Sequence, residues 1–159
     1  MHDETVNRTT NGEGKIRDLY LKEIKSLDAG SWFDSNSPSE KVPTLKEILA
    51  KFENRVHIFV EIKSEEEDLL IELRSLLETM GWIPDNNYEK SGEALTVPGI
   101  SIISFLQDQL LLSAKMLPEL AHGLLTIETS EELIEWCVSE GMVGIFPYVG
   151  YIDKNFSLL

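Results

Sequence analysis

The sequence contains one cysteine, few basic residues and no long apolar segment. Cys137 alone rules out an internal disulfide and leaves too few thiolates for a metal cluster. The 14 Lys and Arg residues face 28 Asp and Glu, giving a formal net charge of -14. Nonspecific binding to nucleic acid or to an anionic membrane is therefore not expected. The apolar stretch 100–112 is interrupted by the polar run 107–109, so no membrane span is expected either.

The composition is that of a globular protein. With 159 residues, 42% of them hydrophobic, and a mean hydropathy of -0.12, the chain can bury a core but is short for two domains. We expect one domain over residues 1–159, and we expect Cys137 to be buried in it as a small apolar side chain. The first residues lack the pattern of a signal peptide, which favours a cytoplasmic location.

The stretch Val56 to Lys63 is rich in β-branched residues and predicts a strand in a parallel sheet. Because side chains alternate across a strand, Phe59, Glu61 and Lys63 share one face, while the other face is apolar and packs on helices. In parallel α/β folds, ligands bind at the carboxyl ends of strands. Glu61 and Lys63 are therefore candidates for chemistry, and a self-neutralising ion pair at a strand end is the open alternative.

Helical patterns alternate with strand patterns along the rest of the chain. Thr44 to Glu47 fits a capping box, and so does Ser64 to Glu67. The predicted helices cover residues 18–27, 44–52, 64–80, 106–117 and 131–140, and the predicted strands cover residues 56–63, 100–105, 121–127 and 142–148. Residues 82–99 are polar and rich in Pro, Asn and Gly, which predicts a long loop. Four strands alternating with helices predict a run of βα units.

Four motifs in this order resemble the glycerophosphodiester phosphodiesterase family. They are His2 to Gly14, Leu27 to Phe33, Val42 to Leu45 and Glu61 to Lys63. Taken alone, the polar first motif reads as a flexible terminus. The resemblance, which continues more weakly through the later βα units, implies a (β/α)8 TIM barrel that hydrolyses glycerophosphodiesters to glycerol 3-phosphate and an alcohol. It also implies a divalent cation, Mg²⁺ or Ca²⁺, and a role in lipid metabolism.

The resemblance further implies roles for three residues. His2 is similar to a catalytic acid/base histidine, Glu61 to a carboxylate ligand of the metal, and Lys63 to the cation that binds the phosphate. These residue types suit the reaction, since a cation and a lysine neutralise charge on phosphoryl oxygens while imidazole moves protons near neutral pH. Trp32 and Phe33 could line a substrate cleft, although packing of a loop onto the barrel is the commoner role of such aromatics.

Other titratable residues in these regions favour structural roles. His57 and His122 lie outside the motifs, and we expect barrel filling for the first and loop packing for the second. Asp3 and Arg8 are interpreted as residues that shape their loop.

The sequence also departs from the family pattern. The family begins with a His-Arg-Gly strand and a second strand with two acidic metal ligands, whereas only Met1 precedes His2 here. A barrel of this type has eight strands in about 250 residues, against the four predicted here. We therefore expect a partial barrel, inactive alone, that self-associates or is complemented by the missing barrel segments. The alternative is a noncatalytic α/β binding module derived from the enzyme.

Overall fold

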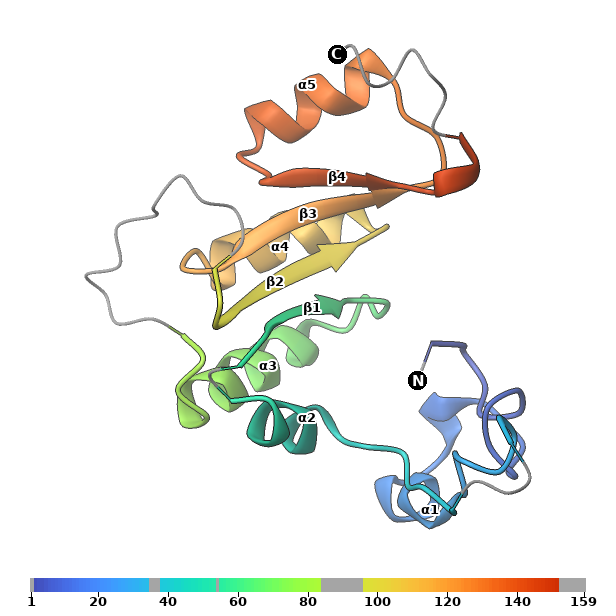
Figure 1. The fold of residues 1–159 in the computed structure, drawn as a ribbon. Coiled ribbons are helices and arrows are strands. Elements are labelled where there is room, and N and C mark those ends of the chain that lie inside the picture. The colour runs from blue at the N-terminus through green and yellow to red at the C-terminus, as the bar shows by residue number, and fades with distance from the viewer. Residues whose placement is uncertain (1, 35–37, 54, 84–95, 152–159) are drawn as a thin grey trace. The chain divides into compact units, whose positions relative to one another are not determined.

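The computed structural model describes residues 2–34, 38–53, 55–83 and 96–151 (Figure 1). Internal contacts divide the chain into two compact units, Met1–Lys51 and Phe52–Leu159. Each unit is described by itself.

The first unit is built around the ordered loop 2–14. The loop closes through an antiparallel bridge between Thr5 and Lys15, and the Val6 amide donates to the Gly14 carbonyl at 3.0 Å. Val6 is fully buried, and its carbonyl accepts a hydrogen bond from the Thr10 hydroxyl at 2.7 Å. A flexible terminus, expected from composition alone, is therefore wrong for these residues, because apolar burial and side-chain hydrogen bonds fix the loop.

Three short helices follow in the first unit, η1 (Ile16–Asp18), α1 (Leu21–Ser26) and α2 (Leu45–Lys51). Helix α1 begins later than predicted, since Tyr20 rather than Asp18 precedes it and the Tyr20 amide donates to the Glu23 carboxylate at 2.7 Å. The capping box at Thr44 is confirmed. The Thr44 amide donates to the Glu47 carboxylate at 2.7 Å, and the Glu47 amide donates back to the Thr44 hydroxyl at 3.2 Å.

The second unit is a four-stranded parallel sheet with three helices. The strands are β1 (His57–Glu61), β2 (Gly99–Ser104), β3 (Ala121–Thr126) and β4 (Gly144–Pro147), and the helices are α3 (Glu67–Thr79), α4 (Gln107–Met116) and α5 (Glu131–Ser139), followed by η2 (Val149–Tyr151). The spatial order β1-β2-β3-β4 equals the chain order (Figure 1). This order is typical of consecutive strands in a (β/α)8 barrel, whereas a doubly wound sheet reverses its order at a switch point.

The sheet is strongly curved. Two strands separate β1 from β4, so in a flat sheet they would lie about 14 Å apart. Nevertheless the rings of Phe59 on β1 and Phe146 on β4 meet edge to face, with centroids 5.6 Å apart. Gly123 on β3 makes this possible, because a Cβ there would collide with the Phe146 ring. The face that carries Phe59, Glu61, Ile103, Gly123 and Phe146 is called the concave face below.

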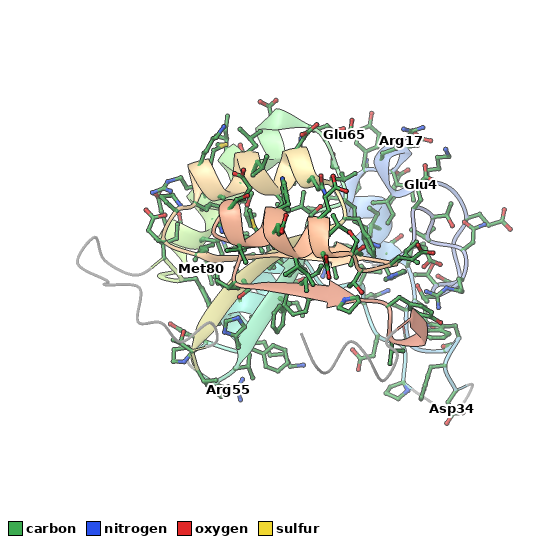
Figure 2. All side chains as sticks on the ribbon, turned by 90° about the horizontal axis from the view of Figure 1, so that it is seen from above. Glu4, Arg17, Asp34, Arg55, Glu65 and Met80 are labelled. Carbon is green, nitrogen blue, oxygen red and sulfur yellow. The ribbon has the colours of Figure 1, made fainter. Side chains whose placement is uncertain are left out.

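The opposite face packs against helices and forms the core of the unit. Helix α4 contacts both β2 and β3, and Figure 2 shows α4 and α5 on the same side of the strands. His122 on β3 is buried in this layer, where its Nδ1 donates to the Leu120 carbonyl and its Nε2 accepts from the buried Ser113 hydroxyl at 2.8 Å. The expected loop packing of His122 is therefore wrong. Strand alternation places the ring toward α4.

Helix ends in the second unit follow local rules with one exception. Gly81 and Gly141 have φ of +70° and +68°, the left-handed conformation that ends α3 and α5 without steric cost. Ser130 caps α5 by accepting from the Leu133 amide. The capping box expected at Ser64 is wrong, because α3 begins at Glu67 and the Ser64 hydroxyl accepts from the Glu66 amide. In the described ranges, no helix is both long and apolar enough to cross a membrane.

Candidate active site

Glu61 and Lys63 lie together at the carboxyl end of β1. Glu61 is the last residue of the strand and pairs in register with Ile103 of β2, so it belongs to the concave face. Lys63 follows two residues later, and its Nζ lies 3.4 Å from Glu61 Oε2. The side chains are 24% and 44% exposed, respectively, so the pair is reachable from solvent and contributes little to stability. The ion pair that the sequence left open as an alternative is thus present, and it lies at the carboxyl end of the strand, where ligands of such folds bind.

His57 lies at the opposite end of β1 and fills space there. Its Nδ1 donates to the Thr96 carbonyl at 2.7 Å, and its Nε2 accepts from the Ser101 hydroxyl at 2.8 Å. The half-buried ring also contacts Phe59, with centroids 5.0 Å apart. Both ring nitrogens thus contact the protein, in line with the expected filling role.

His2 lies in the first unit, in contact with its neighbour Asp3. The His2 Nδ1 lies 3.0 Å from Asp3 Oδ1, and the His2 side chain is 77% exposed. Arg8 donates two hydrogen bonds to the same carboxylate, from Nε to Oδ2 at 2.6 Å and from Nη2 to Oδ1 at 2.8 Å. Hydrogen bonds from Arg8, and secondarily from His2, hold the pKa of Asp3 far below its ordinary value. Asp3 and Arg8 therefore shape the loop as expected.

Asp28 organises the second motif, a role that the sequence interpretation missed. Its carboxylate accepts from the Ser31 hydroxyl at 2.5 Å and from the amides of Gly30 and Ser31 at 2.8 and 3.2 Å. These hydrogen bonds, that of the Ser31 hydroxyl first, lower the pKa of Asp28 to about 2. An Asp followed by Gly and Ser within three residues is the signal that could have identified this turn. The Trp32 indole donates to the Ala29 carbonyl at 2.9 Å.

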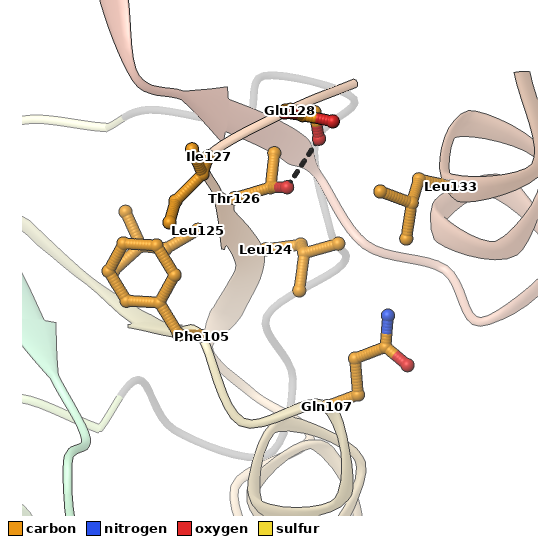
Figure 3. Close-up of a pocket in the computed structure, with 8 residues that line it drawn as sticks. All are labelled: Phe105, Gln107, Leu124, Leu125, Thr126, Ile127, Glu128 and Leu133. Carbon is orange, nitrogen blue, oxygen red and sulfur yellow. Dashed lines mark hydrogen bonds between the residues drawn. The ribbon is translucent and has the colours of Figure 1, made fainter. Parts of the chain in front are cut away.

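An open pocket of about 520 Å³ lies over the carboxyl end of β3 (Figure 3). Its lining is mainly apolar, with Phe105 and Ile127 on the strand ends and Leu133 from α5. The Thr126 hydroxyl at its rim donates to the Glu128 carbonyl at 2.5 Å. The lining residues lie at or just after the carboxyl ends of the predicted strands 100–105 and 121–127, so the rule that ligands bind at strand carboxyl ends could have identified them.

Glu61 is the residue that the resemblance assigns as a ligand of the divalent cation. The Glu61 carboxylate has the hard oxygen atoms that Mg²⁺ or Ca²⁺ prefers, but it supplies at most two of the six or more oxygens such a cation takes. No group of three His, Cys, Asp or Glu side chains that could hold a metal occurs among residues 2–34, 38–53, 55–83 and 96–151. Glu61 therefore fits the chemistry of one ligand, and the described residues do not complete a metal site.

The structure thus brings Glu61 and Lys63 together in the second unit and places His2 against Asp3 in the first. The predicted aromatics Trp32 and Phe33 contact each other edge to face and are 49% and 80% exposed.

The sequence is similar to a known protein family and to characterised relatives. The model of the glycerophosphoryl diester phosphodiesterase family matches residues 1–149. A glycerophosphodiester phosphodiesterase of Bacillus subtilis is 46% identical over 40% of this chain and 25% of its own length. One from Caldanaerobacter subterraneus is 48% identical over 40% of this chain and 27% of its own length. The matched regions thus span about a quarter of these relatives.

A solved structure extends the likeness over the whole chain. The phosphodiesterase of Oleispira antarctica, in complex with the product sn-glycerol-3-phosphate, is 26% identical and superposes with a TM-score of 0.78. The match covers 99% of this chain and 60% of the Oleispira chain. With the sequential parallel sheet, it confirms the predicted fold class, a partial (β/α)8 barrel with four parallel strands.

Proposed function

This chain belongs to the glycerophosphoryl diester phosphodiesterase family, and from that membership we propose that it acts in metal-dependent hydrolysis of glycerophosphodiesters to sn-glycerol 3-phosphate and an alcohol, a reaction of lipid metabolism. The observation that carries the proposal is the ion pair of Glu61 and Lys63, 3.4 Å apart at the carboxyl end of β1 in a barrel-type sheet. The related Oleispira enzyme, solved with sn-glycerol-3-phosphate, supports the choice of substrate.

Lys63 is the residue we assign to the phosphate. A phosphodiester carries a negative charge, and attack on it develops further charge on the phosphoryl oxygens. The Lys63 side chain is 44% exposed and its ammonium contacts Glu61 near the strand end, so an incoming phosphate oxygen can approach it. A phosphate there would share or replace the partly solvated contact with Glu61, which costs little because exposed ion pairs are weak.

Glu61 is the residue we assign to the cation as one of its oxygen ligands. A divalent cation bound there would supply charge neutralisation at the phosphoryl oxygens. Glu61 also orients the Lys63 ammonium through the 3.4 Å contact. Because Glu61 and Lys63 are two residues apart, a bound cation and the Lys63 ammonium would both neutralise charge on one phosphoryl group.

His2 is the residue we assign to proton transfer. Imidazole is the side chain best suited to exchanging protons near neutral pH, and protonation of a leaving alcohol oxygen is the step that needs such an acid. The 77% exposed His2 ring can meet a substrate from solvent. The 2–14 loop holds the backbone that carries it.

The test is hydrolysis of glycerophosphocholine in the presence of Mg²⁺ or Ca²⁺. The purified chain is assayed alone and mixed with the segments of the Oleispira enzyme that it does not match, and its size distribution is measured in parallel. Release of glycerol 3-phosphate in either arm that stops with Lys63→Met and persists with Lys115→Met supports the proposal. Lys115 on α4 is the matched control, a lysine away from the strand end. Absence of hydrolysis in both arms contradicts it.

A further inference from the structure

We propose that Asp3 is the positioning residue of His2, fixing which ring nitrogen carries the proton. This inference rests on the proposed function, because it specifies how His2 is prepared for proton transfer. It adds a second role for Asp3 to the structural role in the loop described above.

The contact geometry defines the direction of the hydrogen bond. Asp3 Oδ1 lies 3.0 Å from His2 Nδ1 and 2.8 Å from Arg8 Nη2, while Oδ2 lies 2.6 Å from Arg8 Nε. A carboxylate only accepts hydrogen bonds. The Nδ1 atom of His2 must therefore be the donor, and in the neutral ring the lone pair then lies on Nε2.

Arg8 reinforces the ionised and oriented form of Asp3. Arg8 and Asp3 form a bidentate ion pair, the strong and directional type of charge-assisted hydrogen bonding. The guanidinium, together with His2, holds the pKa of Asp3 far below its ordinary value, so Asp3 stays a carboxylate through the pH range in which imidazole titrates. Arg8 also limits rotation of the carboxylate, so Oδ1 stays directed at His2.

The arrangement matters for chemistry because neutral imidazole in water favours the opposite tautomer, with the proton on Nε2. A histidine that takes or gives a proton through Nε2 works only if its Nδ1 keeps its own proton, and an adjacent carboxylate provides that. The backbone beneath the pair is fixed, since the Val6 amide donates to the Gly14 carbonyl and the Ile16 amide donates to the Glu4 carbonyl, each at 3.0 Å.

The deciding experiment is nitrogen-15 NMR of the His2 ring in the folded 159-residue chain at a pH where the ring is neutral. We expect the Nδ1-protonated tautomer to predominate. In Asp3→Ala the ratio of the two tautomers should shift toward Nε2 by about threefold or more, the scale of one net hydrogen bond. The matched control is Glu4→Ala, which removes a carboxylate from the neighbouring residue and should leave the ratio unchanged.

Arg8→Ala separates positioning from loop damage. That variant loses the clamp but keeps the carboxylate, so the Nδ1 tautomer should still predominate, and the Val6 amide signal reports whether the loop remains closed. A predominant Nε2 tautomer in the unmodified chain, or an equal shift in Asp3→Ala and Arg8→Ala, would overturn the inference. Because the tautomer is read without substrate, hydrolysis that is indifferent to His2→Ala would instead contradict the proposed function.

Discussion

Asn11 and Asp28 hold each other by a reciprocal pair of hydrogen bonds. The Asn11 amide donates to the Asp28 carbonyl at 3.1 Å, and the Asp28 amide donates to the Asn11 side-chain oxygen at 2.8 Å. Asn11 belongs to the first motif and Asp28 to the second, so these hydrogen bonds join two motifs that are separated in the sequence by η1 and α1. The loop that carries His2 is therefore tied to the second motif through Asn11 and Asp28.

This pair predicts a stability effect from a single side chain. Asn11→Ala removes the acceptor of the Asp28 amide and should lower the free energy of unfolding by about 1 kcal/mol, the net value of one hydrogen bond. Urea denaturation followed by circular dichroism measures it. Lys46→Ala, an exposed change on α2, is the control and should stay within about 0.5 kcal/mol of the unmodified chain. Equal midpoints for both variants would contradict the assigned role of Asn11.

The Glu47 carboxylate predicts acid sensitivity of the first unit. Contacts with the Lys25 ammonium at 2.6 Å and with the Thr44 amide lower its pKa from 4.5 to about 2. A lowered folded pKa means that the stabilisation is fully present above pH 4.5 and is lost as the pH falls toward 2. Thermal unfolding measured across this window should show a decline that is smaller in Glu47→Gln. Identical pH profiles for both proteins would show that Glu47 contributes no acid sensitivity.

The position of the Phe146 ring predicts that alanine substitutions at Gly123 and Gly144 differ strongly in their effect on stability. A Cβ at Gly123 collides with the Phe146 ring, whereas a Cβ at Gly144 lies 3.5 Å from that ring, an ordinary contact. Gly123→Ala should therefore destabilise the sheet by about 1–3 kcal/mol, the cost of overpacking a core, and Gly144→Ala by much less. Chemical denaturation gives both values. Similar losses for the two variants would show that the ring moves aside without cost.

Sequence reasoning predicted the second unit better than the first. The strand of Glu61 and the helix predicted over residues 131–140 follow from local patterns, alternation and helical periodicity, and the structure confirms them as β1 and α5. The Phe59–Phe146 contact depends on curvature across strands far apart in sequence, which no local pattern encodes. The ordered loop depends on the burial of Val6 and on Asn11 meeting Asp28, both tertiary effects, so composition alone predicted flexibility.

Glu61 and Lys63 should differ in what their loss removes. In a barrel assembled with the unmatched segments of the Oleispira enzyme, we expect Glu61→Gln to weaken metal binding and lower turnover by about 100-fold or more, the scale of losing a key electrostatic stabiliser. Lys63→Met should mainly impair phosphate binding and transition-state stabilisation. Steady-state kinetics at limiting metal and limiting substrate separate the two effects. Unmodified activity with either change would show that the site assignment is wrong.

His2 should leave a distinct signature in the pH dependence and in the choice of leaving group. If it protonates the departing alcohol, His2→Ala removes one limb of the pH–rate profile of the assembled barrel. A substrate with a very good leaving group needs little protonation, so a nitrophenyl diester should retain more activity than glycerophosphocholine. His57→Ala is the matched control, since its ring nitrogens contact Thr96 and Ser101 at the other end of β1. It should preserve both limbs and lower the two rates in the same proportion. Equal losses on both substrates in His2→Ala would exclude leaving-group protonation as its role, because an acid matters only in proportion to the basicity of the oxygen it protonates.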